Sequence, residues 1–252
     1  MSSSQTKWLT IAAVVVAVLI APTAVASPPI WEPSFGTNLN LTDDSTIGQT
    51  FASLNFTFPF VGVTYSGAQE LFVSSNGFIS LGTDNGSDCC SGDPALLVAE
   101  YPRIAAFWAD HNPSAGGAVY LNFFNDDADP ESERVVITWD DVLYDNGLPI
   151  TVQIQLVDDG TVIIGFNGWD LTGFNDNTLI GLSPGGGVAD PGSTDFTATL
   201  PFNTGAEPTV YELFIGTPPP IDLDQQNIVF VPNGQGGWGA DVPVELLGFS
   251  VE

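Results

Sequence analysis

The segment from Ile150 to Phe166 constrains the fold more than any other part of the chain. Ile150–Leu156 alternates apolar and polar residues without a break. That period of two is typical of a β-strand with one buried face and one solvent-facing side. Asp159-Gly160 then supplies a tight turn, and Thr161–Phe166 returns as the partner strand. This segment therefore predicts an antiparallel hairpin rather than a helix.

Similar short runs occur along most of the chain. Leu71–Ser75 and Phe78–Leu81 predict another hairpin, in which Asn76-Gly77 forms a type I′ turn. Further strands are expected at Leu54–Phe58, Ile104–Trp108, Ala118–Phe124, Arg134–Trp139, Leu179–Leu182, Phe196–Leu200 and Val210–Phe214. The 27 Gly and 19 Pro residues punctuate these runs, and helix signals are almost absent. We therefore predict an all-β fold, an antiparallel β-sandwich with short turns.

The N-terminus has the features of a secretory signal peptide. Lys7 precedes an apolar run from Leu9 to Ile20, and Ala24-Val25-Ala26 matches a signal-peptidase site. We expect residues 1–26 to be removed, so that the mature chain begins at Ser27 and is secreted. An uncleaved N-terminal anchor is the alternative.

A proline run marks the clearest internal boundary. Residues 27–216 are expected to form the β-sandwich domain, and Pro218-Pro219-Pro220 opens a C-terminal extension over residues 217–252. Two strand-like runs follow, Asn227–Val231 and Glu245–Val251. They either complete the sandwich, form an appendage, or add to the sheet edge of a neighbouring molecule.

The charge of the chain is strongly unbalanced. It contains 30 acidic and three basic residues, a formal net charge of −27. Lys7 leaves with the signal peptide, so Arg103 and Arg134 are the only basic side chains of the mature protein. Such a surface repels nucleic-acid phosphates and anionic membranes. We therefore expect no nucleic-acid partner and no membrane insertion after signal cleavage.

Three motifs suggest catalysis, and each has a simpler structural interpretation. Gly181–Gly185 matches G-x-S-x-G, but Pro184 has no backbone N–H for an oxyanion and does not start the required helix. In Asp110-His111 the acid is more simply a turn residue at a strand end. In Asp140-Asp141 neighbouring side chains point to opposite faces unless the strand is bulged. We predict no catalytic residue and no enzyme activity.

Five carboxylates gather in the connection between Ala118–Phe124 and Arg134–Trp139. Hard oxygen ligands at this density can hold Ca²⁺, although the spacing is not that of an EF-hand. A solvated acidic tip that keeps the hairpin soluble is the alternative. The candidate metal ligands are Asp126, Asp127, Asp129, Glu131 and Glu133. Calcium is the only cofactor that the sequence suggests.

The two cysteines are adjacent, at Cys89 and Cys90. In an oxidising exterior they can form a vicinal disulfide or pair with another chain. A metal site is the weakest alternative, because no other Cys is present and His111 is the only His. Asn40, Asn55 and Asn85 each begin an N-glycosylation sequon. Asn55 falls inside an expected strand, which argues against its modification.

The order of several motifs resembles the extracellular NIDO (nidogen-like) domain. The resemblance covers roughly Phe51 to Leu182, although family members usually carry a second acid soon after the position of Asp110, where this chain has His111-Asn112. The matching motifs are Phe58-Pro59-Phe60, Asn76-Gly77-Phe78, Ile104–Asp110, Ile137-Thr138-Trp139 and Val152–Gly160. The resemblance implies an extracellular adhesion or matrix module rather than an enzyme, and it identifies no ligand.

We therefore expect a secreted, non-enzymatic module that acts by contacts with extracellular proteins or glycans. One alternative is a self-assembling filament or surface-layer subunit whose C-terminal extension pairs with a neighbour. The other is a secreted glycan-active hydrolase that uses Asp110 or Asp140.

Overall fold

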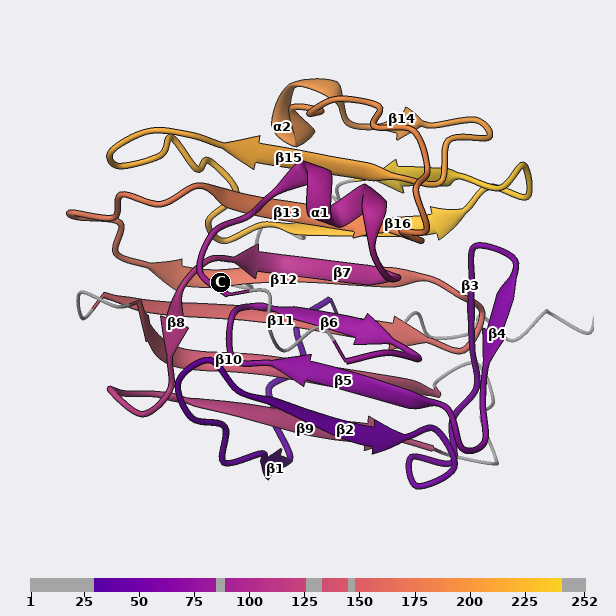
Figure 1. Ribbon diagram of the computed structural model, residues 1–252, viewed down its shortest axis with the longest axis horizontal. Helices are drawn as coiled ribbons and strands as arrows, with labels where there is room; N and C mark the ends of the chain where they lie inside the picture. Colours follow the sequence, from indigo (N-terminus) through magenta and orange to yellow (C-terminus); the bar gives the residue numbers. More distant parts are fainter. Residues whose placement is uncertain (1–29, 85–88, 126–132, 145–147, 242–252) are drawn as a thin grey trace, which may run out of the picture.

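The computed structural model describes residues 30–84, 89–125, 133–144 and 148–241, and it shows two β-sheets packed face to face (Figure 1). The six-stranded sheet has the order β15-β13-β7-β6-β5-β2. Its strands are β2 (Thr46–Thr50), β5 (Glu70–Ser74), β6 (Phe78–Leu81), β7 (Arg103–Trp108), β13 (Thr178–Ser183) and β15 (Val210–Phe214). All its pairings are antiparallel.

The nine-stranded sheet has the order β1-β9-β10-β11-β12-β16-β17-β14, with β8 attached to β10. Its strands are β1 (Thr37–Asn38), β8 (His111–Asn112), β9 (Ala118–Phe124), β10 (Arg134–Tyr144), β11 (Pro149–Val157), β12 (Val162–Trp169), β14 (Phe202–Asn203), β16 (Asn227–Pro232) and β17 (Trp238–Asp241). A separate hairpin pairs β3 (Phe58–Phe60) with β4 (Val63–Tyr65). The predicted all-β antiparallel sandwich is confirmed.

The core lies between the two sheets. Ile137, Ile154 and Ile164 project from the nine-stranded sheet and belong to the same buried cluster as Val73 and Ile104 of the six-stranded sheet. Burying an aliphatic side chain of this size contributes about 1.5–3 kcal/mol. Trp139 also crosses the core, where its Nε1–H donates to the Ser74 carbonyl at 3.0 Å. This bond ties β10 to the end of β5.

The outer face of β11 is buried, which differs from the prediction of a solvent-facing side. Thr151, Gln153 and Gln155 all point away from the core and are all buried. The cause is the N-terminal segment of residues 30–36, which lies over this face. The Gln153 amide exchanges two 3.0 Å hydrogen bonds with the backbone of Glu32. The Gln153 amide is thus satisfied by the chain itself rather than by water.

The same N-terminal segment carries a buried ion pair. The Glu32 carboxylate lies 2.6 Å from the Arg134 guanidinium, and both side chains are buried. Arg134 also stacks over the Phe124 ring at 4.3 Å. Because an uncompensated buried charge is costly, each partner depends on the other.

Two predicted strands are wrong. In Leu54–Phe58 the first two residues lie in a turn and the next two in irregular structure, and the strand β3 begins only at Phe58. Phe196–Leu200 instead contains a short helix, α2 (Phe196–Thr199), because the Asp195 side chain caps it by accepting from the Ala198 N–H at 2.8 Å. The turn leaves Asn55 exposed, as Asn40 is, so the argument against the Asn55 sequon no longer holds. Asn85 lies outside the described residues.

A second helix, α1 (Pro94–Ala99), was not expected. Its signal is present in the sequence as Asp93-Pro94, since Asp93 caps the helix and Pro94 occupies the first turn. The helix covers part of the outer face of the six-stranded sheet, where Leu97 packs with Phe78 and Trp108.

The C-terminal extension contributes strands to the chain's own nine-stranded sheet. β16 pairs with β12, and β17 pairs with both β16 and β14. The run Glu245–Val251 and the expected signal peptide lie outside the described residues. Within the part of the chain that is described, no helix is long and apolar enough to span a membrane.

Candidate functional site

The hairpin turn between β5 and β6 is the centre of the candidate site. Because Val73 pairs with Ile79, the residues Ser75, Asn76 and Gly77 form the loop. Only Gly77 has a positive φ, +78°, whereas a type I′ turn needs positive φ at both Asn76 and Gly77. The predicted type I′ turn is therefore wrong. A three-residue loop with a left-handed glycine replaces it.

Gly77 cannot carry a side chain in this position. A Cβ built on it would lie 2.0 Å from the Phe107 carbonyl oxygen. That close approach lets the Gly77 carbonyl accept hydrogen bonds from Ala106 N–H at 3.0 Å and Phe107 N–H at 3.1 Å. The turn is thus held against β7 by backbone bonds that only glycine permits.

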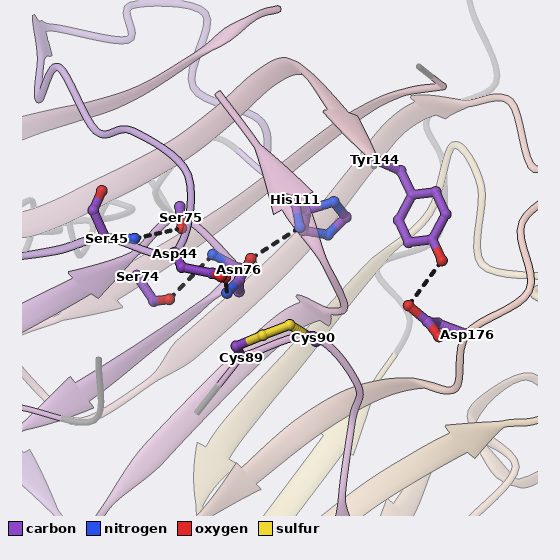
Figure 2. Close-up of a disulfide and its surroundings, with 10 residues drawn as sticks. All are labelled: Asp44, Ser45, Ser74, Ser75, Asn76, Cys89, Cys90, His111, Tyr144 and Asp176. Atoms are coloured by element: carbon purple, nitrogen blue, oxygen red, sulfur yellow. Dashed lines mark hydrogen bonds between the residues drawn. A yellow bond between two sulfur atoms is a disulfide. The ribbon is translucent and has the colours of Figure 1, made fainter. Parts of the chain in front are cut away.

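The buried Asn76 side chain joins three segments of the chain (Figure 2). Its Nδ2 donates to Asp44 Oδ1 at 3.0 Å, and its Oδ1 accepts from the His111 backbone N–H at 2.9 Å. Its own backbone N–H donates to Ser74 Oγ at 3.1 Å. The Asn76 amide therefore positions both Asp44 and the connection between β7 and β8 that contains Asp110.

Asp43, Asp44 and Asp110 come together beside this turn. Each offers a carboxylate oxygen, and these oxygens lie within 4.8 Å of one another. Asp43 and Asp44 are exposed, and Asp110 is half-buried. Such a group of oxygens is close enough for one divalent cation to bridge. Of the three, only Asp110 is predicted from the sequence as a candidate, because nothing in the spacing indicates that Asp43 and Asp44 lie near it.

Cys89 and Cys90 are joined by a disulfide at the same place (Figure 2). Their sulfur atoms and an Asp44 carboxylate oxygen also lie within 4.8 Å of one another. The following residues hold the disulfide loop against the six-stranded sheet, through a bridge between Ser91 and Ala109 and a 3.0 Å bond from Gly92 N–H to the Asn177 carbonyl.

His111, which follows Asp110 in the chain, has a buried, neutral side chain. Its Nε2 lies 2.9 Å from the Phe107 carbonyl, so this nitrogen carries the proton. Burial lowers the pKa of His111 from 6.5 to about 4. Its ring packs against the rings of Phe107 and Tyr144, and the Tyr144 hydroxyl donates to Asp176 at 2.8 Å. His111 is therefore neutral above about pH 5 and contributes packing to the site.

The other acids singled out from the sequence lie elsewhere. Of the five candidate calcium ligands only Glu133 is among the described residues, so the calcium prediction for that loop stays a prediction. Asp140 and Asp141 lie on a β-bulge, since the register of β10 with β11 shifts between Trp139 and Val142. Both flanking residues are buried in the core, which turns the two carboxylates toward the same outer face. Burial, aided by the charge of Asp141, raises the pKa of Asp140.

Ser183 of the G-x-S-x-G match is buried at the end of β13. Its Oγ lies 2.8 Å from Thr209 Oγ1 and accepts from the Gly185 N–H at 3.1 Å. No helix follows it directly. The serine hydroxyl is thus hydrogen-bonded within the chain at the end of β13. The helix that a nucleophile elbow requires does not follow it, as predicted from Pro184.

Both arginines are buried, so neither contributes positive charge to the accessible surface. Arg103 is fully buried over the rings of Phe78 and Trp108, at 4.8 and 4.0 Å from their centroids. Arg134 is held by Glu32. The accessible surface of the described residues therefore presents carboxylates and no Lys or Arg side chain. Within the described part of the chain, no Lys or Arg side chain is therefore available to neutralise the acidic site.

The fold and this site define an acidic β-sandwich, and a comparison with family models identifies its family. A model described as NIDO related matches residues 23–210, about three quarters of the chain. The chain belongs to the NIDO-related family, and the resemblance stated from its motifs is confirmed. No curated protein and no solved structure matches the chain significantly.

Proposed function

We propose that this protein is a secreted, non-enzymatic adhesion or matrix module that acts by contacts with extracellular proteins or glycans. Its family is an extracellular type of domain. The observation that carries the proposal is the surface charge. Both arginines are buried, while Asp43, Asp44 and Asp110 converge at one end of the sandwich. A partner therefore meets carboxylates and is favoured when it brings basic groups or bridging cations.

The proposal is tested by the binding of the mature chain, residues 27–252. We expect binding to immobilised extracellular proteins or glycans that weakens as salt is raised, because exposed charges are screened. The variant Asp43→Asn/Asp44→Asn should bind more weakly. A matched control is Asp222→Asn/Asp224→Asn, which also removes two exposed acids and changes the residue that bonds Thr197 of α2. Absence of binding to every protein and glycan tested would refute an adhesion role.

The enzyme alternative has its own test. Model glycans and esters should release no product in the presence of the mature chain. Turnover that disappears in an Asp110→Asn or Asp140→Asn variant would replace the adhesion proposal with a hydrolase.

The filament alternative loses part of its motivation. It rested on C-terminal strands pairing with a neighbour, and β16 and β17 pair within their own chain. The run Glu245–Val251 remains as the segment to test, by electron microscopy of a chain that ends at Asp241.

A further inference from the structure

The outer edges of the two large sheets differ in how they are protected. The edge strands of the nine-stranded sheet, β1 and β14, are two residues long. In the six-stranded sheet the edge strand β15 is covered, because Thr194 N–H donates to the Tyr211 carbonyl at 2.8 Å and Leu213 N–H to Ser193 Oγ at 2.9 Å. Short and covered edges are the usual protection against pairing with another chain. Among the described residues, the remaining edge is β2.

Within the part of the chain that is described, β2 has none of these protections. It is five residues long, Thr-Ile-Gly-Gln-Thr, with no charged residue and no proline. Its register with β5 runs without a bulge from Thr46 to Thr50. All its residues are partly exposed. Figure 1 draws it as the last strand on the lower border of the front sheet.

Alternate backbone groups of β2 point toward the open side. Ser45 exchanges bonds with Ser75, and Phe51 N–H donates to the Gln69 carbonyl at 3.0 Å, so the odd-numbered residues face β5. The N–H and C=O groups of Thr46 and Gly48 therefore face outward. The half-exposed Phe72 ring lies beside Gly48, 2.9 Å from where a Cβ would be. An added strand would find backbone partners and an apolar contact here.

The surroundings of β2 are acidic. Asp43 and Asp44 precede it and are exposed, and Thr46 Oγ1 donates to Asp84 at 2.8 Å. Glu70 lies across from Thr50. A second copy of this chain brings the same acids and a formal charge of −27, so like-charge repulsion opposes pairing of two β2 edges. The complementary occupant carries basic residues at the ends of an extended, uncharged segment.

We propose that β2 is a docking edge, to which a partner protein adds a β-strand flanked by Lys or Arg residues. The partner strand forms backbone hydrogen bonds with Thr46 and Gly48, and its basic ends lie near Asp44, Asp84 and Glu70. This proposal rests on the proposed adhesion function and specifies the partner as protein rather than glycan.

The test uses the mature chain and a rhodamine-labelled peptide, Lys-Val-Thr-Val-Thr-Val-Lys, followed by fluorescence anisotropy. Two variants form a matched pair. Thr46→Val and Thr46→Pro both remove the hydroxyl that bonds Asp84, but only Thr46→Pro also removes the outward N–H. We expect Thr46→Pro to bind at least about fivefold more weakly than Thr46→Val, as the loss of one hydrogen bond predicts. The peptide with Glu in place of Lys should bind far less than the basic peptide.

A second readout does not depend on the folding of a variant. In the unmodified chain, the basic peptide should slow amide hydrogen exchange at Thr46 and Gly48 but not at Asn38 on β1, an edge strand of the nine-stranded sheet. No peptide binding, equal binding by the two Thr46 variants, or unchanged exchange at both β2 amides would each overturn the proposal. So would a dimer in light scattering that Thr46→Pro abolishes, because the occupant would then be a second copy.

The two proposals fail in different ways. If extracellular proteins bind Thr46→Pro and Thr46→Val equally, the adhesion function stands and the docking edge falls. If the basic peptide binds at β2 while no extracellular protein or glycan binds the chain, the adhesion function falls and the edge remains.

Discussion

Replacing Gly77 by alanine tests the central turn of the candidate site. Gly77 has φ +78°, and a Cβ there would lie 2.0 Å from the Phe107 carbonyl oxygen. Gly67 is a matched control, because it has φ +62° and nothing within 4 Å of a Cβ. Both substitutions impose the same left-handed backbone on alanine. Only the one at Gly77 also forces two backbone segments apart.

The two costs can be estimated separately. A left-handed alanine costs about 1–2 kcal/mol, and the smaller conformational freedom of the unfolded chain returns about 0.4–1 kcal/mol. Gly67→Ala should therefore cost about 1 kcal/mol. Overpacking against β7 adds about 1–3 kcal/mol for Gly77→Ala, a total of about 2–4 kcal/mol.

Scanning calorimetry of the mature chain measures the difference. In a chain of this size 1 kcal/mol lowers the melting temperature by about 2–4 °C, so we expect a loss of roughly 2–4 °C for Gly67→Ala and 4–16 °C for Gly77→Ala. Gly77→Ala should also weaken the binding that depends on Asp44, since Asn76 positions that side chain. Equal losses of melting temperature in the two variants would refute the account of the turn.

The remaining predictions concern charged groups. Glu32→Gln leaves Arg134 buried without its carboxylate and should lower the free energy of unfolding in urea by about 3–5 kcal/mol; most of this should return when Arg134→Met is added, and a loss as small as that of a surface acid would contradict the buried pair. Burial raises the pKa of Glu212 from 4.5 to about 7, so its carboxyl group stabilises the fold below pH 4.5 and this stability is lost as the pH rises through 7. The melting temperature of Glu212→Gln relative to the parent should therefore rise between pH 4.5 and 7, and a constant difference would count against the shift. Excess Ca²⁺ should raise the melting temperature of the mature chain, as a ligand of the folded state does, and Asp126→Asn/Asp127→Asn should lower the rise more than Asp43→Asn/Asp44→Asn does; no rise in the parent, or a rise that only Asp43→Asn/Asp44→Asn removes, would disprove the calcium prediction for that loop.

Most strands could be predicted because their signals are local. Val210–Phe214 was located to the residue, and the β11–β12 hairpin followed from its alternation and its Asp-Gly turn. The wrong strand predictions concern short apolar runs, because such runs also occur in turns and short helices. Phe196 begins a helix because Asp195 caps it and because its N–H donates to the distant Glu212 carboxylate at 2.9 Å. Periodicity over so few residues cannot separate these outcomes.

The candidate site was harder to predict than the fold. Asp110 was visible as an acid that ends a buried run, and the Asn76-Gly77 turn was visible as a hairpin signal. Asp43 and Asp44 gave no signal, because their relation to Asp110 exists only after β2 pairs with β5 and β7 reaches the same end of the sandwich. Because acidic residues are frequent along the chain, only their proximity in the folded structure identifies Asp43, Asp44 and Asp110 as a group.

The sequence by itself determined the antiparallel β-sandwich, the NIDO-related family and the acidic charge of the chain, because these depend on residue spacing, short motifs and composition. Only the tertiary structure decided which polar groups water can reach. The outward side chains of β11 are buried because residues 30–36 cover them, and both arginines are enclosed by packing. The same packing leaves β2 open and brings three acids to one turn. Burial and proximity are properties of contacts between distant residues, so no local pattern encodes them.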